Sequence, residues 1–473
     1  MRTQSLSCCS LAASGVLKLS DEKKHKISHD LQFDGGHVVQ FHLGVLSSYS
    51  YLLCSCDAAM LIDPGRDVNS YEEYLFENHI RLCGVFLTHI HSDFVAGHLE
   101  AGERFNVPIF LSRESGASFG HIPLDDDTDF SLGRLKLHFF AAPGHSDEGL
   151  CMTVSTRQGK PEMIFTGDAL DVSCSDTTGM DWVEKLRKMS DDIRIYPGHE
   201  IGDVDKNWTT LGREKQRNRL FNANAEVRNG HSLHLETLRQ INSKGPELLD
   251  WDNLLHPCHV NGSMASPVHP VVDIRNCTSY AQSHIPYSLN IESNGRLEYW
   301  TARLFSPPCE VVLTGDNEMD LAEAALRLSS VGCRTKGFLF DDWLESGLPI
   351  RSSCCLDAQE LDTKMWSDEP PLILDVRSEK EWLKERLPGS INIPLQELEK
   401  RMEELPTDRE IVLVCASGFR SAVAVGILEG GGFDKLCNLK GGLGAWIEEG
   451  KKLNSGREKR VQTPEQSKCG IKS

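Results

Sequence analysis

Short apolar runs rich in β-branched and aromatic residues recur through the first half of the chain, and each ends in Gly, Pro, His or Asp. Between about residues 31 and 220 they include VVQFHL, AAMLIDPG, LCGVFLTHI, LKLHFFAAPGH and EMIFTGDAL. Runs of this length, bounded by such residues, predict strands that end in loops. The stretch 221–249 is more polar and has a helical pattern, so we place a domain boundary after residue 250.

The second half of the chain contains one pattern twice. VVDIRNCTSYAQSHIPYSLNI in the first copy aligns with LILDVRSEKEWLKERLPGSINI in the second, and EVVLTGDNEMDLAEAA aligns with EIVLVCASGFRSAVAV. The Asp and the Pro of these segments are 13 residues apart in both copies, at Asp273 and Pro286 and at Asp375 and Pro388. Such an internal repeat indicates two similar domains. Strand and helix patterns alternate within each copy, which predicts an open parallel α/β sheet with crossover helices.

Composition narrows the class of protein. A chain of 473 residues is too long for one hydrophobic core, so several domains are expected. The formal net charge of −19 disfavours nucleic acid and anionic membranes as partners and leaves small molecules as the natural ligands. No apolar run reaches the roughly 20 residues that a transmembrane helix needs. Sixteen cysteines without CxxC pairs indicate a reducing compartment and not a disulfide scaffold.

The two ends of the chain lack the pattern of a folded core. The first 20 residues contain Arg2, Lys18, five serines and no acidic residue, a composition found in organellar transit segments and in disordered tails alike. We therefore expect residues 1–30 to be a leader or a tail, and the compartment stays open between the mitochondrial matrix and the cytoplasm. Residues 453–473 are polar and rich in Lys and Arg, and we expect a disordered tail there.

Histidine and aspartate residues gather at the ends of several predicted strands. THIHSD follows the run GVFL and places His89, His91 and Asp93 at alternate positions, so that their side chains can point to one side. His145 in APGHSD and Asp168 in FTGDAL end two other runs, and YPGHE ends a fourth. A single histidine after a strand is more often an ordinary hydrogen-bonded residue. His or Asp in four separate loops indicates a metal site.

The motifs THxHxD, PGH, TGD and YPGH, preceded by IDPG, resemble those of the metallo-β-lactamase superfamily, and within it they are most similar to the persulfide dioxygenases. The resemblance covers roughly residues 35–220 and implies an αββα sandwich. Position 94 decides the subfamily, because dinuclear zinc hydrolases of this fold have a His there that helps to hold a second metal. Here the residue is Phe94, which cannot bind a metal.

The resemblance implies one Fe(II) ion per chain, held by two histidines and one carboxylate, a set that leaves positions open for O₂ and substrate. The ligands carried over by position are His89, His145 and Asp168. The residues that would orient these ligands or bound water are His91, Asp93 and His199. If the metal is zinc, His91 becomes a candidate fourth ligand. The implied reaction oxidises glutathione persulfide with O₂ to sulfite and glutathione.

The segment REKQRNRL resembles the glutathione-binding stretch of the persulfide dioxygenases and makes Arg219 a candidate for binding a glutathione carboxylate. A solvated basic helix face explains the same segment equally well. Three departures weaken the likeness. No proline stands between Asn218 and Arg219, DVSCSDTTGMDW lacks a Gly-Cys-Gly-Arg run, and Ile201 stands where an aromatic residue is expected.

A second candidate site is CASGFRS, residues 415–421, which lies between the buried-strand pattern EIVLV and the helical pattern AVAVGILE. A strand, a six-residue loop and a helix N-terminus form an anion-binding cradle of backbone N–H groups. Cys415 is expected to act there as a thiolate nucleophile, and Arg420 adds a positive charge. With LDVRS, LPGSINIP and KGGLGAW around it, the segment resembles the rhodanese family. That resemblance implies transfer of sulfane sulfur, with thiosulfate, sulfite and glutathione as partners.

The first copy of the repeat lacks the residues for this chemistry. Gly315 stands in the position of Cys415, and Asp320 in that of Arg420. We therefore expect an inactive copy that packs against the active one or shapes the passage between the two sites. The predicted domains are a metallo-β-lactamase-fold domain at 31–250, an inactive rhodanese-like domain at 256–350 and an active rhodanese domain at 356–452. The oligomeric state stays open and includes a homodimer.

The leading hypothesis is a persulfide dioxygenase fused to a rhodanese and acting in hydrogen sulfide catabolism, where fusion raises the local concentration of a shared persulfide. One alternative is a zinc-dependent thioester hydrolase of the glyoxalase II kind. Phe94 and the short segment 221–249 argue against it. Another alternative is a non-enzymatic persulfide carrier or sensor with a decayed metal site, against which the intact set of candidate ligands argues.

Overall fold

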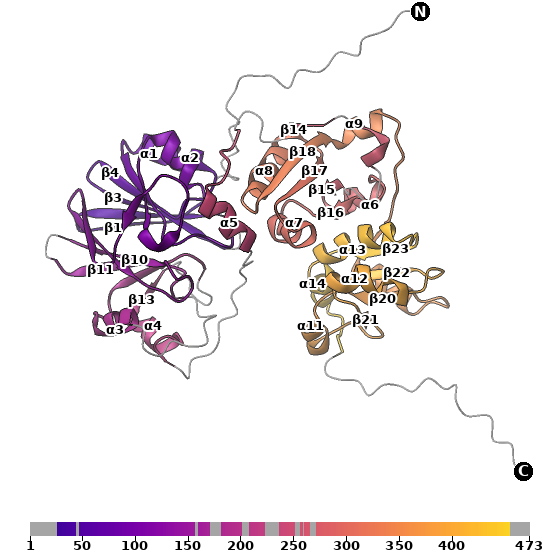
Figure 1. Cartoon of the computed structure of the whole chain (residues 1–473). Helices are drawn as coiled ribbons and strands as arrows, with labels where there is room; N and C mark the ends of the chain where they lie inside the picture. Colours follow the sequence, from indigo (N-terminus) through magenta and orange to yellow (C-terminus); the bar gives the residue numbers. More distant parts are fainter. Residues whose placement is uncertain are drawn as a thin grey trace, which may run out of the picture. The chain divides into compact units, whose positions relative to one another are not determined.

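The computed structural model describes most of the chain (Figure 1). The described residues are 26–43, 47–156, 159–170, 181–200, 208–222, 236–250, 256–258, 260–264 and 271–454. Residues 1–25 of the leader or tail expected at 1–30, residues 455–473 of the tail expected at 453–473, the segment 171–180 and Ile201 lie outside them. Residues 26–30 belong to a strand, and Asn454 forms a β-bridge with Arg386, so the folded part of the chain extends beyond the expected limits at both ends. Among the described residues, no helix combines the length and the apolar character needed to cross a bilayer.

Two β-sheets form the first domain. The strands of the first sheet pair in sequence order and are β1 (Lys26–Phe33), β2 (Gly36–His42), β3 (Tyr49–Ser55), β4 (Ala58–Ile62), β5 (Arg81–Phe86), β6 (Ile109–Ser112) and β7 (Ile122–Leu124). Those of the second sheet also pair in sequence order and are β8 (Thr128–Leu132), β9 (Leu135–Ala141), β10 (Leu150–Ser155), β11 (Pro161–Gly167), β12 (Arg194–Pro197) and β13 (Thr209–Thr210).

Helices cover the outer face of each sheet. Apolar residues of α1 (Val68–Glu77) and α2 (His98–Phe105) share a core with β2 to β6. Those of α3 (Asp181–Lys188) and α4 (Leu211–Arg217) share another with β9 to β12. A third core lies between the two sheets. The layers are therefore helix, sheet, sheet and helix, and the expected αββα sandwich is confirmed. A 3₁₀ turn, η1 (Arg113–Ser115), follows β6, and α5 (Glu236–Lys244) follows the sandwich.

The alternation of side chains along the strands explains the three cores. In β9, Leu137 and Phe139 belong to the core between the sheets, whereas Phe140 belongs to the core under α3. Successive residues of a strand point to opposite faces, so one face of this strand is buried along its length, whereas the other carries exposed Lys136 and is buried only near its end, at Phe140. Phe139 packs edge-on against Phe86 of the opposite sheet, with 4.9 Å between the ring centres.

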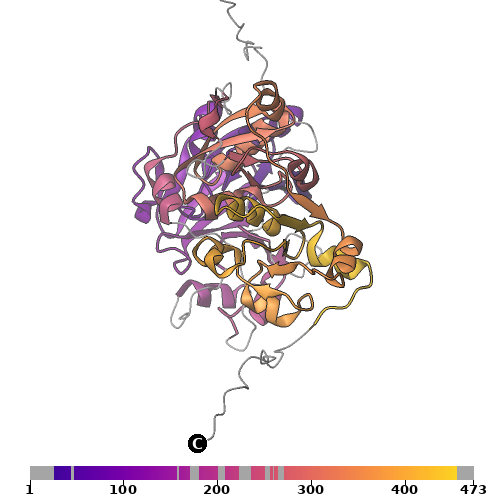
Figure 2. The same cartoon turned by 90° about the vertical axis from the view of Figure 1, so that its right-hand side faces the viewer.

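Each copy of the repeat contains a five-stranded sheet, and strands alternate with helices along this part of the chain (Figure 2). The first sheet has the order β14 (His256–Pro257), β18 (Cys333–Leu339), β17 (Cys309–Gly315), β15 (Val271–Asp273) and β16 (Leu289–Asn290). The second has the order β19 (Cys354–Leu356), β23 (Leu436–Leu439), β22 (Ile411–Val414), β20 (Leu372–Asp375) and β21 (Ile391–Asn392). The two strand orders correspond position by position, as the internal repeat predicted.

The helices of the two copies also correspond. The first copy has η2 (Gly262–Met264), α6 (Cys277–Gln282), α7 (Leu297–Phe305), α8 (Glu318–Ser329) and α9 (Phe340–Glu345). The second copy has α10 (Ala358–Met365), α11 (Glu379–Lys384), α12 (Leu395–Arg401), η3 (Met402–Glu404), α13 (Phe419–Gly430) and α14 (Gly442–Glu448).

By compactness the described residues divide into two units. The first takes in the described part of 1–257 together with 297–311 and 319–336, and the second takes in that of 258–296, 312–318 and 337–473. Helix α7 and most of α8 therefore group with the two-sheet sandwich and not with the rest of their repeat. The domain boundaries expected at 250–256 and 350–356 stay a prediction.

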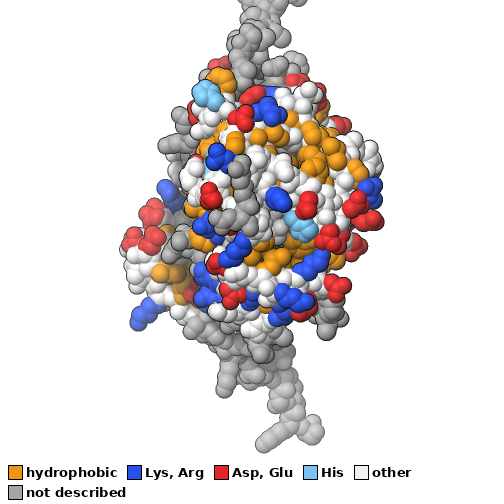
Figure 3. All heavy atoms as spheres, turned by 90° about the vertical axis from the view of Figure 1, so that its left-hand side faces the viewer, with side chains coloured by type: hydrophobic (Ala, Val, Ile, Leu, Met, Phe, Trp, Pro, Cys, Tyr) orange, Lys and Arg blue, Asp and Glu red, His pale blue; other side chains and the backbone are white. Residues whose placement is uncertain are grey.

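Charged side chains of both signs are interspersed on the face that Figure 3 shows, with apolar side chains between them. The net charge of −19 therefore does not produce an unbroken acidic surface on that face. This mixture is typical of ordinary protein surfaces.

Candidate functional site

His89 is held in one tautomer by the residue before it. Asp63 accepts hydrogen bonds from the backbone N–H of Thr88 and from its hydroxyl, both at 2.8 Å. Because the hydroxyl proton goes to Asp63, the Thr88 oxygen accepts from Nδ1 of His89 at 3.0 Å. Nε2 of His89 is then an electron-pair donor, buried and without a hydrogen-bond partner among the described residues. Burial and the neighbouring His91 hold the pKa of His89 well below its usual value, which favours the neutral form that binds metals.

Three side chains from three strand ends converge on one point. His89 follows β5, His145 follows β9 and Asp168 follows β11. Nε2 of each histidine lies 3.6 Å from Oδ2 of Asp168, and the candidate ligand atoms of all three residues lie within 4.8 Å of one another. The structure thus brings the predicted ligand set together. Their role as metal ligands stays a prediction.

Gly167 allows Asp168 to approach the histidines. Its φ of +47° lies in the left-handed region, and a Cβ at this position would stand 2.2 Å from Oγ1 of Thr88. Only glycine fits both the conformation and the space. Steric constraints therefore explain why the TGD motif has Gly at this position.

His199 links the two acidic residues of the site. Its Nδ1 lies 2.7 Å from Oδ1 of Asp168, and its Nε2 lies 2.9 Å from Oδ2 of Asp93. Burial lowers its pKa, but the two carboxylates together hold the pKa of His199 well above its usual value. These contacts suit the predicted orienting role. The candidate ligand atoms of Asp93, Asp168 and His199 also lie within 4.8 Å of one another, so they form a second group that could hold a cation.

His91 lies beside the first group and is not part of it. Its ring stands 4.3 Å from the ring of His89 and 4.3 Å from that of Phe94, which is 2% exposed. Nε2 of His91 lies 3.2 Å from Oδ1 of Asp63. His91 therefore faces Asp63, and Phe94 fills apolar space against its ring. A fourth-ligand role for His91 stays a prediction.

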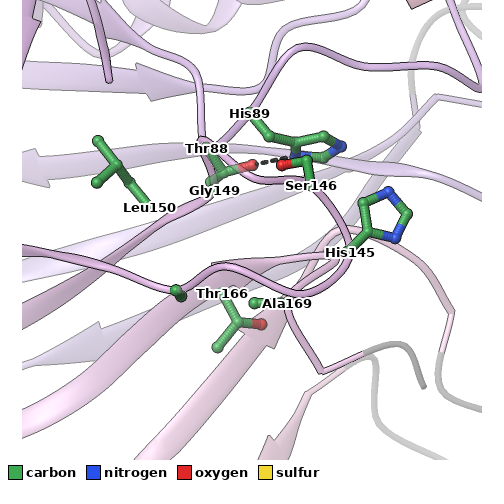
Figure 4. Close-up of a pocket in the computed structure, with 9 residues that line it drawn as sticks. Thr88, His89, His145, Ser146, Gly149, Leu150, Thr166 and Ala169 are labelled. Carbon is green, nitrogen blue, oxygen red and sulfur yellow. Dashed lines mark hydrogen bonds between the residues drawn. The ribbon is translucent and has the colours of Figure 1, made fainter. Parts of the chain in front are cut away.

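A pocket of about 180 Å³, part of it open to solvent, adjoins the two histidines (Figure 4). Its lining residues are Thr88, His89, Ala142, His145, Ser146, Gly149, Leu150, Thr166 and Ala169. Oγ of Ser146 is buried and has no hydrogen-bond partner among the described residues. A hydroxyl donor without a partner among the described residues therefore lies in the wall of this pocket, beside the candidate metal ligands.

Arg219 is exposed just beyond α4. The side-chain amide of the preceding Asn218 donates to the carbonyl of Leu170 at 2.8 Å. This bond ties the segment to the loop that begins at Asp168. The arrangement is compatible with binding of a substrate carboxylate, and that role of Arg219 stays a prediction.

Cys415 follows β22 at the start of a tight loop and is 1% exposed. Its sulfur accepts a hydrogen bond from the backbone N–H of Gly418 at 3.1 Å. The hydroxyl of Ser421 lies 3.4 Å from the same sulfur and 3.0 Å from the carbonyl oxygen of Gly418, and its one proton can go to either. Gly418 has a φ of +92°, which a residue with a side chain rarely adopts. The loop thus directs a backbone N–H at the sulfur of Cys415. Arg420 donates to both oxygens of Glu381, at 2.9 and 2.8 Å, so its charge is paired.

Two segments of the chain match known families. Residues 43–199 match the Metallo-beta-lactamase superfamily, and residues 357–449 match the Rhodanese-like domain. A sulfurtransferase of Allochromatium vinosum is 33% identical over 95 residues, which are 20% of this chain and 89% of that protein. The chain belongs to the rhodanese-like family. In it, a metallo-β-lactamase superfamily domain precedes the rhodanese-like domain.

Other likenesses concern the metallo-β-lactamase part of this rhodanese-like chain. A hydroxyacylglutathione hydrolase of Francisella tularensis subsp. novicida is 25% identical over 194 residues, which are 38% of this chain and 75% of that protein. The crystal structure of a metallo-beta-lactamase from Staphylococcus aureus subsp. aureus COL is similar with a TM-score of 0.55. It is 23% identical and covers 65% of this chain and 99% of that chain. At this identity the likeness shows the fold alone.

The first rhodanese-like copy has the sheet without the nucleophile. In each copy the Asp of the repeat lies opposite the residue that precedes the loop. The residue that follows is Gly315 in the first copy and Cys415 in the second, as the alignment predicted. The backbone N–H of Tyr287 in the first copy donates to Glu429 on α13 at 3.0 Å, and Nε2 of His284 lies 3.2 Å from the same carboxylate. The first copy therefore packs against the helix that begins at the Cys415 loop, and its lack of activity stays a prediction.

Sequence reasoning missed three residues of these sites. Thr88 sets the tautomer of His89, Ser146 offers a hydroxyl to the pocket, and Glu381 pairs with Arg420. The first two stand directly beside motif histidines in THIH and PGHS, a local signal that could have identified them. Glu381 is 39 residues away from Arg420, and no local signal connects the two.

Proposed function

We propose that the chain is a persulfide dioxygenase with an attached sulfurtransferase. At the first site, glutathione persulfide, O₂ and water give glutathione and sulfurous acid, which ionises to sulfite. At the second, Cys415 exchanges sulfane sulfur between thiosulfate and glutathione. The observation that carries the proposal is the convergence of His89, His145 and Asp168 in a chain whose other site is a rhodanese loop.

The donor set favours one Fe(II). Two imidazole nitrogens and one carboxylate on one face suit non-haem iron. The resemblance to dinuclear zinc hydrolases would require a His at position 94 to help hold a second metal, and the residue there is Phe94. Bound iron would supply redox chemistry with O₂ at this face. The protein supplies the rest: Thr88 fixes the proton on Nδ1 of His89, and Ser146 offers a hydrogen bond in the adjoining pocket.

The sulfurtransferase step follows from the contacts of Cys415. Its thiolate attacks the outer sulfur of thiosulfate, an S–S bond forms, and sulfite leaves with the electron pair of the broken bond. A glutathione thiolate then takes the sulfur as glutathione persulfide and restores the cysteine thiolate. The backbone N–H of Gly418, and the Ser421 hydroxyl when its proton turns to sulfur, stabilise the Cys415 thiolate that is present before and after the transfer.

Metal analysis of anaerobically purified protein, combined with oxygen uptake on addition of glutathione persulfide, tests the dioxygenase. We expect about one iron per chain, rapid uptake and release of sulfite. His89→Ala should abolish uptake and leave sulfur transfer from thiosulfate to cyanide intact. Zinc in place of iron and no uptake would reject the proposal. Loss of both activities in a folded His89→Ala protein would reject two independent sites.

A zinc-dependent hydrolase of glutathione thioesters is the second candidate. The group formed by Asp93, Asp168 and His199, together with the hydroxyacylglutathione hydrolase relative, favours it. Two zinc ions per chain and hydrolysis of a glutathione thioester without oxygen uptake would support this reading. One iron per chain with no hydrolysis would exclude it.

A further inference from the structure

The loop that carries the HxHxD motif is bound from outside the sandwich. Asn242 on α5 directs its whole side-chain amide at this loop. Its Nδ2 donates to the carbonyls of His91, at 2.9 Å, and Phe94, at 2.7 Å, and its Oδ1 accepts from the N–H of Ala96 at 2.9 Å. Asn242 is 1% exposed, so water does not compete for these bonds. One side chain therefore satisfies three backbone groups of the loop.

Two further contacts complete this support. The N–H of Val95 donates to the carbonyl of Ser330 at 2.6 Å, and Ser330 lies between α8 and β18 of the first rhodanese-like copy. Glu148 accepts from the N–H of Ile90 at 3.1 Å and from Arg239 of α5 at 2.9 Å. The segment 90–96 is thus tied to α5 and to the α8–β18 turn.

The α8–β18 turn also packs on α5. Gly332 in this turn has a φ of +76°, and a Cβ there would lie 3.1 Å from Leu238 and 3.2 Å from Ile241. All of these residues belong to one compact unit. Helix α5 is therefore in contact with the metal-motif loop through Asn242 and with the rhodanese-like copy through Leu238 and Ile241.

We infer that the inactive rhodanese-like copy, acting through α5, positions the metal-binding loop, and that Asn242 is the positioning residue. Metal affinity depends on ligands that are held before the ion arrives, and displacement of their loop weakens binding. The buried N–H and C=O groups of segment 90–96 cannot turn to solvent, so losing their partners displaces the loop. This inference holds whichever metal and whichever reaction the site supports.

Binding of Co(II) to the metal-free full-length protein, followed by its visible absorption, tests the role of Asn242. We expect Asn242→Ala to weaken binding by about 10–100-fold, the range for groups that orient ligands, and to change the spectrum. Asn242→Asp keeps the acceptor for Ala96 but sets a buried carboxylate oxygen against the carbonyls of His91 and Phe94, so it should weaken binding at least as much as Asn242→Ala. Gln240→Ala, at an exposed position of the same helix, should match wild type. Sulfur transfer by Cys415 reports that each variant is folded.

A matched pair of glycines tests the role of the rhodanese-like copy. Gly332→Ala introduces a methyl group against α5, whereas Gly347→Ala carries a similar strain, at a φ of +68°, with nothing within 4 Å. We expect weaker Co(II) binding and faster amide exchange at Val95 and Ala96 only in Gly332→Ala. Equal affinities for the two glycine variants, or wild-type affinity and spectrum in folded Asn242→Ala, would overturn the inference. Failure of the dioxygenase reaction alone would leave it standing.

Discussion

The two rhodanese-like copies share a hydrogen-bonded frame and differ in the loop beside it. In the first copy, Arg275 donates from its backbone N–H, Nε and Nη2 to Asp273, and from Nη2 also to the carbonyl of Ser283. In the second, Arg377 donates in the same way to Asp375 and to the carbonyl of Glu385.

The difference teaches which residues the fold needs and which the chemistry needs. Asp273 and Asp375 are both fully buried, and a buried charge requires its partner, so each copy depends on its Asp–Arg pair to fold. No such constraint acts on the loop. Cys415 and Ser421 are the residues proposed for sulfur transfer in one copy, while Gly315 and Leu321 stand in the corresponding positions of the other.

Replacement of the nucleophile should have the largest effect. We expect Cys415→Ser to lower sulfur transfer from thiosulfate to cyanide by at least about 10³-fold, because the first copy has Gly315 in place of the nucleophile. Steady-state assays of sulfur transfer check this. Cys56→Ser, at an exposed cysteine of the first domain, is the control and should keep full activity. Substantial residual transfer would mean that the first copy, or another cysteine, is active.

Loss of the buried carboxylate should destabilise both copies to a similar degree. Asp375→Asn and Asp273→Asn each leave a buried arginine without its counter-charge, which costs about 3–5 kcal/mol. Urea denaturation measures this loss. Glu397→Gln removes an exposed partner of Arg401 and should cost less than about 1 kcal/mol. A loss confined to Asp375→Asn would mean that the frame of the first copy has no structural role.

A smaller effect is expected from the partner of Arg420. This partner is Glu381, and the hydrogen bonds that it accepts from Arg420 lower its pKa to about 2. The ionised Glu381 therefore stabilises the folded protein at any pH above its pKa in the unfolded chain. This stabilisation is lost only as the pH falls towards 2, so the ion pair with Arg420 persists at neutral pH. Glu381→Gln leaves Arg420 unpaired and should lower the KM for anionic thiosulfate by about 2–5-fold. Glu379→Gln, at an exposed position of the same helix, is the control. An unchanged KM would show that the charge of Arg420 does not contribute to binding of thiosulfate.

A new cysteine in the first copy is expected to have no effect on sulfur transfer. Gly315→Cys in the Cys415→Ser background should recover no measurable sulfur transfer, because Leu321 cannot donate as Ser421 does to the sulfur of Cys415. The transfer assay with a prolonged time course checks this. Recovery of activity would show that the shared frame alone activates a thiol, and it would remove the distinction between the copies.

Much of the fold could be predicted from local patterns in the sequence. Alternating apolar runs such as that of β9 predict strands with one buried face, and the internal repeat predicts two sheets of the same strand order. The motif residues His89, His145 and Asp168 were predictable for the same reason. Each ends a strand, and strand ends of one sandwich meet at a common edge.

The sequence by itself determined the strands, the repeat, the candidate ligands and the absence of a nucleophile at Gly315. Only the tertiary structure decided how these parts support one another. Asn242 meets the carbonyl of His91 across 151 residues, and Glu381 meets Arg420 across 39. Such contacts join side chains whose neighbours in the chain give no hint of the partner. The packing of whole elements decides them, because a buried hydrogen bond forms only where two surfaces bring donor and acceptor within about 3 Å.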